Sequence, residues 1–213
     1  MWRFNLFGFP VTVEPWFWLV SFLMGGGIEA RGREGFTLVA IWIAVVFVSI
    51  MVHELGHALA GRRFGAHPEI GLHGMGGVAV MHGGYFTRWQ SIFVSAAGPL
   101  ASLALGTASF AFALWQQPAN GMVHVALRDL LFVNFFWTAV NLLPILPLDG
   151  GQITRDVLGP RRIQIAIWLG VICAAAVGLW AFSVRQTFLG VMMLILAFSN
   201  FQNQKIQGGV IKN

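Results

Sequence analysis

The sequence predicts an all-α polytopic membrane protein with about six transmembrane helices and a short membrane-associated β-hairpin. Of its 213 residues, 57% are hydrophobic and only 10% are charged, whereas an ordinary soluble domain has about 25% charged residues. Residues Phe36 to Val52 carry no charge, and a helix that crosses a bilayer core of about 30 Å needs around 20 residues. No internal repeat or soluble domain is apparent, so we expect a single transmembrane domain over residues 1–213.

The first elements surround one long apolar helix. Residues Phe4 to Val13 alternate loosely and predict a short strand or an interfacial segment. Pro15 suits the first position of a helix, and a first membrane helix is expected from about Pro15 to Gly27, which is short for a full crossing. The second helix begins near Phe36 and ends among the glycines of 61–65, which can cap it.

Residues Pro68 to Tyr85 are too short and too rich in glycine for a spanning helix. Apolar residues alternate on both sides of the segment 74–77, which predicts a β-hairpin. Its exposed edge could receive an unwound substrate segment as an added strand; a surface loop with no substrate role is an equally weighted interpretation. His73 and His82 fall here, and polar loop histidines are favoured over additional metal ligands.

The remaining chain predicts four more spans. Segment 95–102 of the third helix consists mostly of small residues, which allow helices to approach closely in lipid. The core that carries the chemistry is expected over about 36–151, with accessory helices over 160–203. The third to sixth helices are predicted at about Trp89–Trp115, Leu130–Leu143, Ile163–Phe182 and Thr187–Phe201.

The basic residues indicate topology rather than a nucleic-acid surface. The sequence pI is about 10.7, but the basic residues are scattered at the ends of apolar runs. If six helices span with the N-terminus inside, only Arg31, Arg33, Arg128 and Arg185 fall on the outer side. Both termini are therefore expected in the cytoplasm. Small size fits a prokaryotic inner membrane, and nucleic-acid binding is not expected.

The second helix carries His53-Glu54-Leu55-Gly56-His57, which is the HExxH pattern. On a helix the two histidines share one face, where both imidazoles can reach one metal ion, and zinc is the expected ion. Glu54 follows at about 100° of helix turn and can serve as a base toward a water that the metal makes acidic. Ionisable groups at membrane depth are costly and usually mark a functional site. The alternative is that two helix histidines match the pattern by chance.

A catalytic zinc site generally has three protein ligands and one open position. Asp149 is the best candidate for the third ligand, since it is an acid bordered by apolar sequence at the expected depth of His57. Pro144 and Pro147 end any preceding helix, and the glycines after Asp149 let the backbone turn sharply and approach the metal. The alternative is a turn-forming aspartate without a ligand role.

Together these motifs resemble a known family. HELGHALA at 53–60 within an apolar helix, together with NLLPILPLDGG at 141–151, resembles the site-2 protease family of intramembrane zinc metalloproteases. The Ala-Gly-Pro-Leu-Ala core of segment 95–102 is similar to the third-helix pattern of that family, although Ser102 stands where members often carry Asn. The resemblance covers about 36–151, in a compact form without a PDZ-like or other regulatory domain.

The resemblance implies roles for individual residues. It implies one zinc ion held by His53, His57 and Asp149, with Glu54 as the general base. Asn141 matches the Asn that precedes the proline-rich turn in the family, which implies an oxyanion or substrate contact. The implied activity is hydrolysis of a peptide bond in or near the transmembrane segment of a membrane-protein substrate, as in regulated intramembrane proteolysis.

A different class of function stays open at this point. Buried His, Asp and Asn side chains can line an ion path, so a transporter or a pseudoprotease that binds metal without proteolysis is the alternative. Glu54 beside both histidines is what hydrolysis needs and what metal binding alone does not. Expected partners are transmembrane substrates and membrane lipid, and self-association of the chain is left open.

Overall fold

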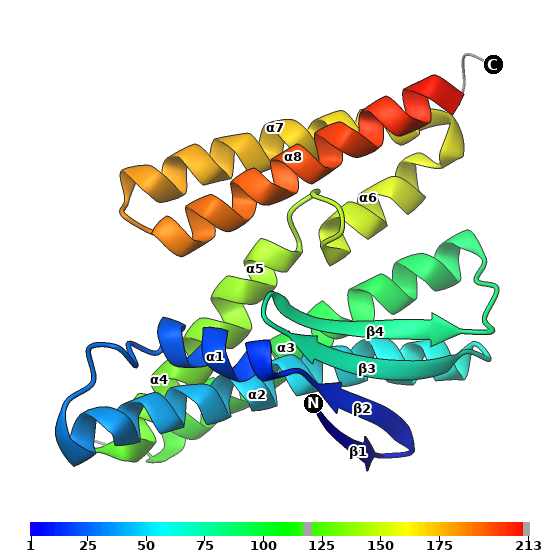
Figure 1. The fold of residues 1–213 in the computed structure, drawn as a ribbon. Helices are drawn as coiled ribbons and strands as arrows, with labels where there is room; N and C mark the ends of the chain where they lie inside the picture. The colour runs from blue at the N-terminus through cyan, green and yellow to red at the C-terminus, as the bar shows by residue number, and fades with distance from the viewer. Residues whose placement is uncertain (117–120, 211–213) are drawn as a thin grey trace. The chain divides into compact units, whose positions relative to one another are not determined.

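The computed structural model describes residues 1–116 and 121–210 (Figure 1). These residues form two compact units. The first unit contains residues 1–86 and 97–139, and the second contains residues 87–96 and the chain from residue 140 onward. Helix α3 (Arg88–Gln116) runs through both, because its first turns belong to the second unit and the rest to the first.

The first unit is built around helix α2. This helix has 32 residues, since the apolar run contains no proline and no turn signal before Gly65, which takes a φ of +88° just after the helix end. Its other helices are α1 (Pro15–Met24), α4 (Met122–Leu131) and a π-helix (Phe132–Trp137), and α2 itself spans Gly32–Arg63. The π-helix continues without a break into α5 (Thr138–Asn141), whose last two residues belong to the second unit.

The first unit also contains a four-stranded sheet, which is larger than the expected hairpin. Its strands are β1 (Trp2–Leu6), β2 (Phe9–Val13), β3 (His67–His73) and β4 (Gly76–His82), in the order β1-β2-β3-β4. The predicted hairpin is β3 and β4, which pair antiparallel. The N-terminal segment forms two further strands because Phe7 and Gly8 both take positive φ and turn the chain back. Strand β2 then pairs in parallel with β3, which leaves β4 at an edge.

A polar contact crosses the apolar interior of the first unit. Asn134, in the π-helix, donates from Nδ2 to Ser49 Oγ of α2 at 2.9 Å. Asn134 and Thr138, which lie four residues apart, are both buried. The donation gives the buried amide NH₂ group of Asn134 a partner, which lowers the desolvation cost of that group in an apolar environment.

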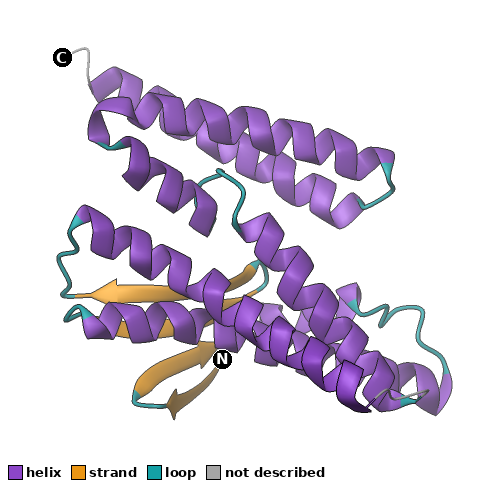
Figure 2. Cartoon of the chain, turned by 180° about the vertical axis from the view of Figure 1, so that it is seen from behind, coloured by secondary structure: helices purple, strands orange, loops and turns teal. Residues whose placement is uncertain are grey.

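The second unit consists mainly of a helix pair. Helices α7 (Ile163–Ser183) and α8 (Thr187–Val210) lie side by side (Figures 1 and 2). The small-residue stripe of α7, namely Gly170, Ala174 and Gly178, is buried. A Cβ added at Gly178 would lie 3.3 Å from Met193 Cβ of α8, so the stripe allows the two helices to pack closely.

Helix α6 (Asp149–Leu158) corrects one expectation. The glycines after Asp149 were expected to form a sharp turn, but both are helical residues in the first turn of α6. A Cβ at Gly151 would lie 2.5 Å from Ile145 O, and a Cβ at Gly150 would lie 2.5 Å from Leu143 O. The glycines therefore serve close packing of the helix start against the preceding turn. A short 3₁₀ helix (Pro160–Arg162) connects α6 to α7.

The expected number of six spans is not confirmed. The described residues contain four helices that are long and apolar enough to cross a membrane, Gly32–Arg63, Arg88–Gln116, Met122–Asn141 and Pro160–Ser183. Two shorter apolar helices, Pro15–Met24 and Thr187–Gln202, correspond to the first and sixth expected spans. The helices are those of an integral membrane protein.

Candidate metal centre

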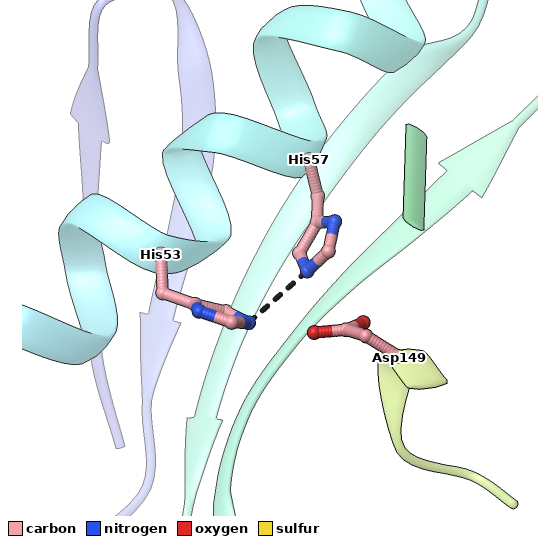
Figure 3. A group of neighbouring side chains, drawn as sticks. All are labelled: His53, His57 and Asp149. Carbon is pink, nitrogen blue, oxygen red and sulfur yellow. Dashed lines mark hydrogen bonds between the residues drawn. The ribbon is translucent and has the colours of Figure 1, made fainter. Parts of the chain in front are cut away.

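Two histidines of α2 form the centre of the site. His53 and His57 are one helical turn apart, and their Nε2 atoms lie 3.2 Å from each other (Figure 3). Both side chains are buried, with 8% of each residue exposed, and the ring planes are inclined by 76°. The two Nε2 atoms thus converge on one point, which is the arrangement that two ligands of one ion require.

The other nitrogen of His53 contacts a serine of α3. His53 Nδ1 lies 3.0 Å from Ser102 Oγ, and both residues are buried. When Nδ1–H donates to this hydroxyl, Nε2 keeps its lone pair for a metal, and the ring orientation is fixed. Sequence reasoning noted Ser102 only as a departure from the family pattern. The sequence shows Ser102 as a polar residue at the end of a helix segment of small residues, but this does not indicate that His53 is its partner.

Glycines bring α3 directly against α2, the helix that carries His53 and His57. A Cβ added at Gly56 would lie 2.5 Å from Ala97 O, so the two helix backbones nearly touch there. A Cβ added at Gly98 would lie 2.5 Å from Cε1 and 2.7 Å from Cδ2 of His57. Any side chain at Gly98 would therefore occupy the place of the imidazole. The small-residue segment predicted close packing of helices, and the structure adds that it accommodates a histidine ring.

Glu54 lies against the sheet. The residue is only 4% exposed, and a Cβ added at Gly77 of β4 would lie 2.5 Å from Glu54 Oε1 and 2.6 Å from its Cγ. The carboxylate is thus adjacent to the backbone of the edge strand. The sequence predicted Gly77 in the turn of the hairpin and did not indicate that it would lie against Glu54.

Asp149 is the candidate for the third metal ligand. It is the first residue of α6, and the ligand atoms of His53, His57 and Asp149 all lie within 4.8 Å of one another (Figure 3). Two imidazole nitrogens and a carboxylate oxygen are a typical ligand set for a catalytic zinc ion. The convergent Nε2 atoms, the contact at His53 Nδ1 and the missing side chain at Gly98 fit a metal ion at this position.

The other residues singled out from the sequence lie elsewhere. Asn141 is the last residue of α5 and is half-buried, and its role remains a prediction. His73 Nδ1 accepts a hydrogen bond from the Met75 N–H at 3.2 Å. His82 Nε2 lies 3.7 Å from Glu69 Oε2, and both side chains are more than half exposed. Within the described chain, neither histidine belongs to the group around His53.

A histidine pair and a buried glutamate on an apolar helix, with an aspartate nearby, are the residue types expected of a membrane metallopeptidase site. The chain belongs to the peptidase M50B-like family, whose family model matches residues 34–148. The matched segment contains α2 except its first two residues, the strands β3 and β4, α3 and the proline-rich turn. The resemblance to site-2 proteases drawn from the motifs is thereby confirmed.

Individual relatives agree with this membership. A putative zinc metalloprotease of Synechocystis sp. is 32% identical over 164 residues, which are 72% of this chain and 43% of the relative. A zinc metalloprotease of Methanocaldococcus jannaschii is 28% identical over 160 residues, 74% of this chain and 45% of the relative. The chain spans less than half the length of these two relatives. A solved site-2 protease from Methanocaldococcus jannaschii shares the fold, with a TM-score of 0.67 at 24% identity over 95% of this chain and 94% of the solved one.

Proposed function

We propose that this protein is an intramembrane zinc metalloprotease that hydrolyses a peptide bond in or near the transmembrane segment of membrane-protein substrates. The observation that carries the proposal is the combination of two convergent histidine nitrogens with a buried glutamate beside an edge strand. Metal binding alone would need the histidines but not the buried acid of Glu54.

His53, His57 and Asp149 would hold the zinc ion. The ion supplies Lewis-acid polarisation and raises the acidity of water when bound. Ser102 Oγ holds the His53 ring by its contact with Nδ1, and the backbone at Gly98 fits against the His57 ring. Neighbours of this kind orient metal ligands, and their loss typically reduces metal affinity about 10–100-fold.

Glu54 would act as the general base. Its carboxylate accepts a proton from the attacking water and then gives a proton to the leaving amine, which is the usual task of a positioned carboxyl group in peptide hydrolysis. Burial among α2 and β4 keeps the side chain in one orientation. Asn141 is proposed to contact the substrate or the developing oxyanion, as its place before the proline-rich turn suggests.

Strand β4 would hold the substrate. It lies at the edge of the sheet, so one side of its backbone is available for pairing with an extended segment. Gly77 of this strand is next to Glu54, and a peptide added to β4 would therefore run past the general base. A transmembrane helix hides its carbonyl groups, so the substrate must unwind locally before it is cut.

The proposed setting is a prokaryotic inner membrane with both termini in the cytoplasm. Besides the four long apolar helices, the shorter helices Pro15–Met24 and Thr187–Gln202 would complete six spans. The distribution of basic residues supports this orientation, and it puts His57 and Asp149 toward the cytoplasmic side.

The test combines zinc content with cleavage of a model transmembrane substrate by the detergent-purified protein. We expect the wild type to hold about one zinc ion per chain and to cut. Glu54→Gln should retain zinc and lose cleavage, because the amide cannot accept the proton. Asp149→Asn should lose both zinc and cleavage, because the ligand set is incomplete.

Glu69→Gln is the matched control. It makes the same chemical change as Glu54→Gln at an exposed acid of β3, whose carboxylate lies 3.7 Å from His82 Nε2. It should leave zinc content and cleavage unchanged. Cleavage by Glu54→Gln at the wild-type rate would overturn the assignment of the base. A wild type that holds zinc and cuts none of the transmembrane substrates would favour a binding protein instead.

A further inference from the structure

Asn200 of the C-terminal helix reaches the turn that carries Asp149. The residue is fully buried, with 0% exposed. Its Nδ2 donates to Leu146 O at 2.5 Å and also to Leu196 O, one turn earlier in α8, at 2.8 Å. The amide thus links α8 to the proline-rich turn of residues 142–148. Both elements belong to the second unit.

The orientation of the Asn200 amide follows from its neighbours. Both groups that Nδ2 approaches are carbonyl oxygens, which only a donor can satisfy. On the other side, a Cβ added at Gly170 of α7 would lie 3.0 Å from Asn200 Oδ1 and 3.2 Å from Pro144 O. Gly170 therefore allows the asparagine and the turn to lie against α7 at the same place.

The proline-rich turn of residues 142–148 is held together by its own backbone. Pro144 and Pro147 have no N–H to donate. The turn is closed by two short backbone bonds, from the Ile145 N–H to Leu143 O at 2.7 Å and from the Leu148 N–H to Ile145 O at 2.8 Å.

Helix α6 begins directly after this turn and is packed onto it. Its first turn meets the turn so closely that Gly150 and Gly151 leave no room for a side chain. A displacement of Leu146 must therefore displace the start of α6, and Asp149 is the first residue of that helix.

We infer that Asn200 is a positioning residue for the metal site and that it acts through the turn to fix Asp149. The inference rests on the proposed function, in which Asp149 is the third zinc ligand. It gives the α7 and α8 pair, which the sequence indicated to be accessory, an indirect part in metal binding through the turn. The residue is polar inside an apolar helix because its task is to bind a backbone carbonyl of another segment.

The experiment measures the zinc dissociation constant of the detergent-purified full chain by competition with a chelator. Asn200→Leu keeps the size of the side chain and removes both donations, and we expect zinc to bind about tenfold more weakly. Asn200→Ser is the second variant: its hydroxyl still reaches the carbonyl one turn earlier in its own helix but is too short to reach Leu146. It should weaken zinc binding to a similar extent.

The matched control is Met193→Ala. Met193 is also fully buried in α8 and faces Gly178 of α7, so its truncation disturbs the helix pair without touching the turn. Zinc affinity should be unchanged.

A second arm repeats Asn200→Leu in an Asp149→Ala background, at zinc concentrations high enough for the remaining ligands His53 and His57 to bind the ion. If Asn200 acts through Asp149, the second substitution has no further effect there. A further loss in that background would show general destabilisation and overturn the inference. Wild-type affinity in both Asn200 variants would also overturn it while leaving the proposed function intact. If Asp149→Ala binds zinc like the wild type, the proposed ligand set itself is wrong.

Discussion

Gly98→Ala is the substitution that most directly tests the packing of the metal site. The added Cβ would lie 2.5 Å from Cε1 and 2.7 Å from Cδ2 of His57, whereas non-bonded carbons are normally about 3.5–4.0 Å apart. The ring and the helix backbone must therefore separate by about 1 Å. Overpacking of this kind typically costs about 1–3 kcal/mol.

The separation has two routes, and both damage the site. If the imidazole moves, its Nε2 leaves the point on which the two histidines converge. If α3 moves instead, it withdraws from Gly56 and takes Ser102 away from His53. A misplacement of about 1 Å can reduce turnover about 10²-fold. We expect zinc affinity to fall at least about tenfold and cleavage about 100-fold.

The assay is the same chelator competition, with cleavage of the model substrate and helical content by circular dichroism measured in parallel. Gly106→Ala is the control on the same helix, since its Cβ would lie 3.2 Å from the Cβ of Asn134 and the ring of Phe135, far from the histidines in the chain. It should bind zinc like the wild type. Wild-type zinc affinity in Gly98→Ala, with normal helical content, would refute the reasoning.

Two further predictions concern the neighbours of His53 and Glu54. Ser102→Ala removes the partner of His53 Nδ1, so zinc affinity should fall about tenfold in the chelator competition. Gly77→Ala introduces a Cβ at 2.5 Å from Glu54 Oε1; zinc content should be retained while cleavage falls about 100-fold, which the two assays together will show.

Each of these variants has a control of the same chemistry. Ser109→Ala removes a buried hydroxyl from the same helix as Ser102, but that hydroxyl donates to Leu105 O of its own helix. Gly71→Ala adds a Cβ to the neighbouring strand at an ordinary 3.4 Å from Val78 Cγ1. Both controls should keep wild-type zinc affinity and cleavage. Loss of zinc in Gly77→Ala would contradict the prediction, because it would mean that displacing Glu54 also disturbs the metal ligands.

Local patterns predicted the elements that carry the histidines. The convergence of His53 and His57 needs only a helix, since a spacing of four residues determines it, and the uncharged run before them already predicts that helix. The hairpin of β3 and β4 was also predictable, because alternation and a glycine-rich turn are local signals. The family resemblance, confirmed by the match over residues 34–148, rests on the same local motifs.

Contacts between distant segments were not predictable in the same way. The parallel pairing of β2 with β3 joins segments more than fifty residues apart, and nothing within Phe9–Val13 indicates that partner. Helix α6 was missed because Gly150 and Gly151 usually break helices. Their tight fit against residues 142–146 compensates for that intrinsic preference, and such a fit exists only in the folded chain.

The sequence shows which residues of the apolar helices are polar, but it does not show their hydrogen-bond partners. Ser49 is bonded to Asn134, His53 to Ser102, and Asn200 to a backbone carbonyl. An unpaired polar group in an apolar environment costs several kcal/mol, so each such residue in a membrane helix predicts a partner, either a carbonyl of its own helix, as for Ser109, or a group on another segment. The sequence identifies the residues that need partners, and the fold decides the pairs. The pair of His53 and Ser102 joins α3 to the helix that carries both histidines of the site.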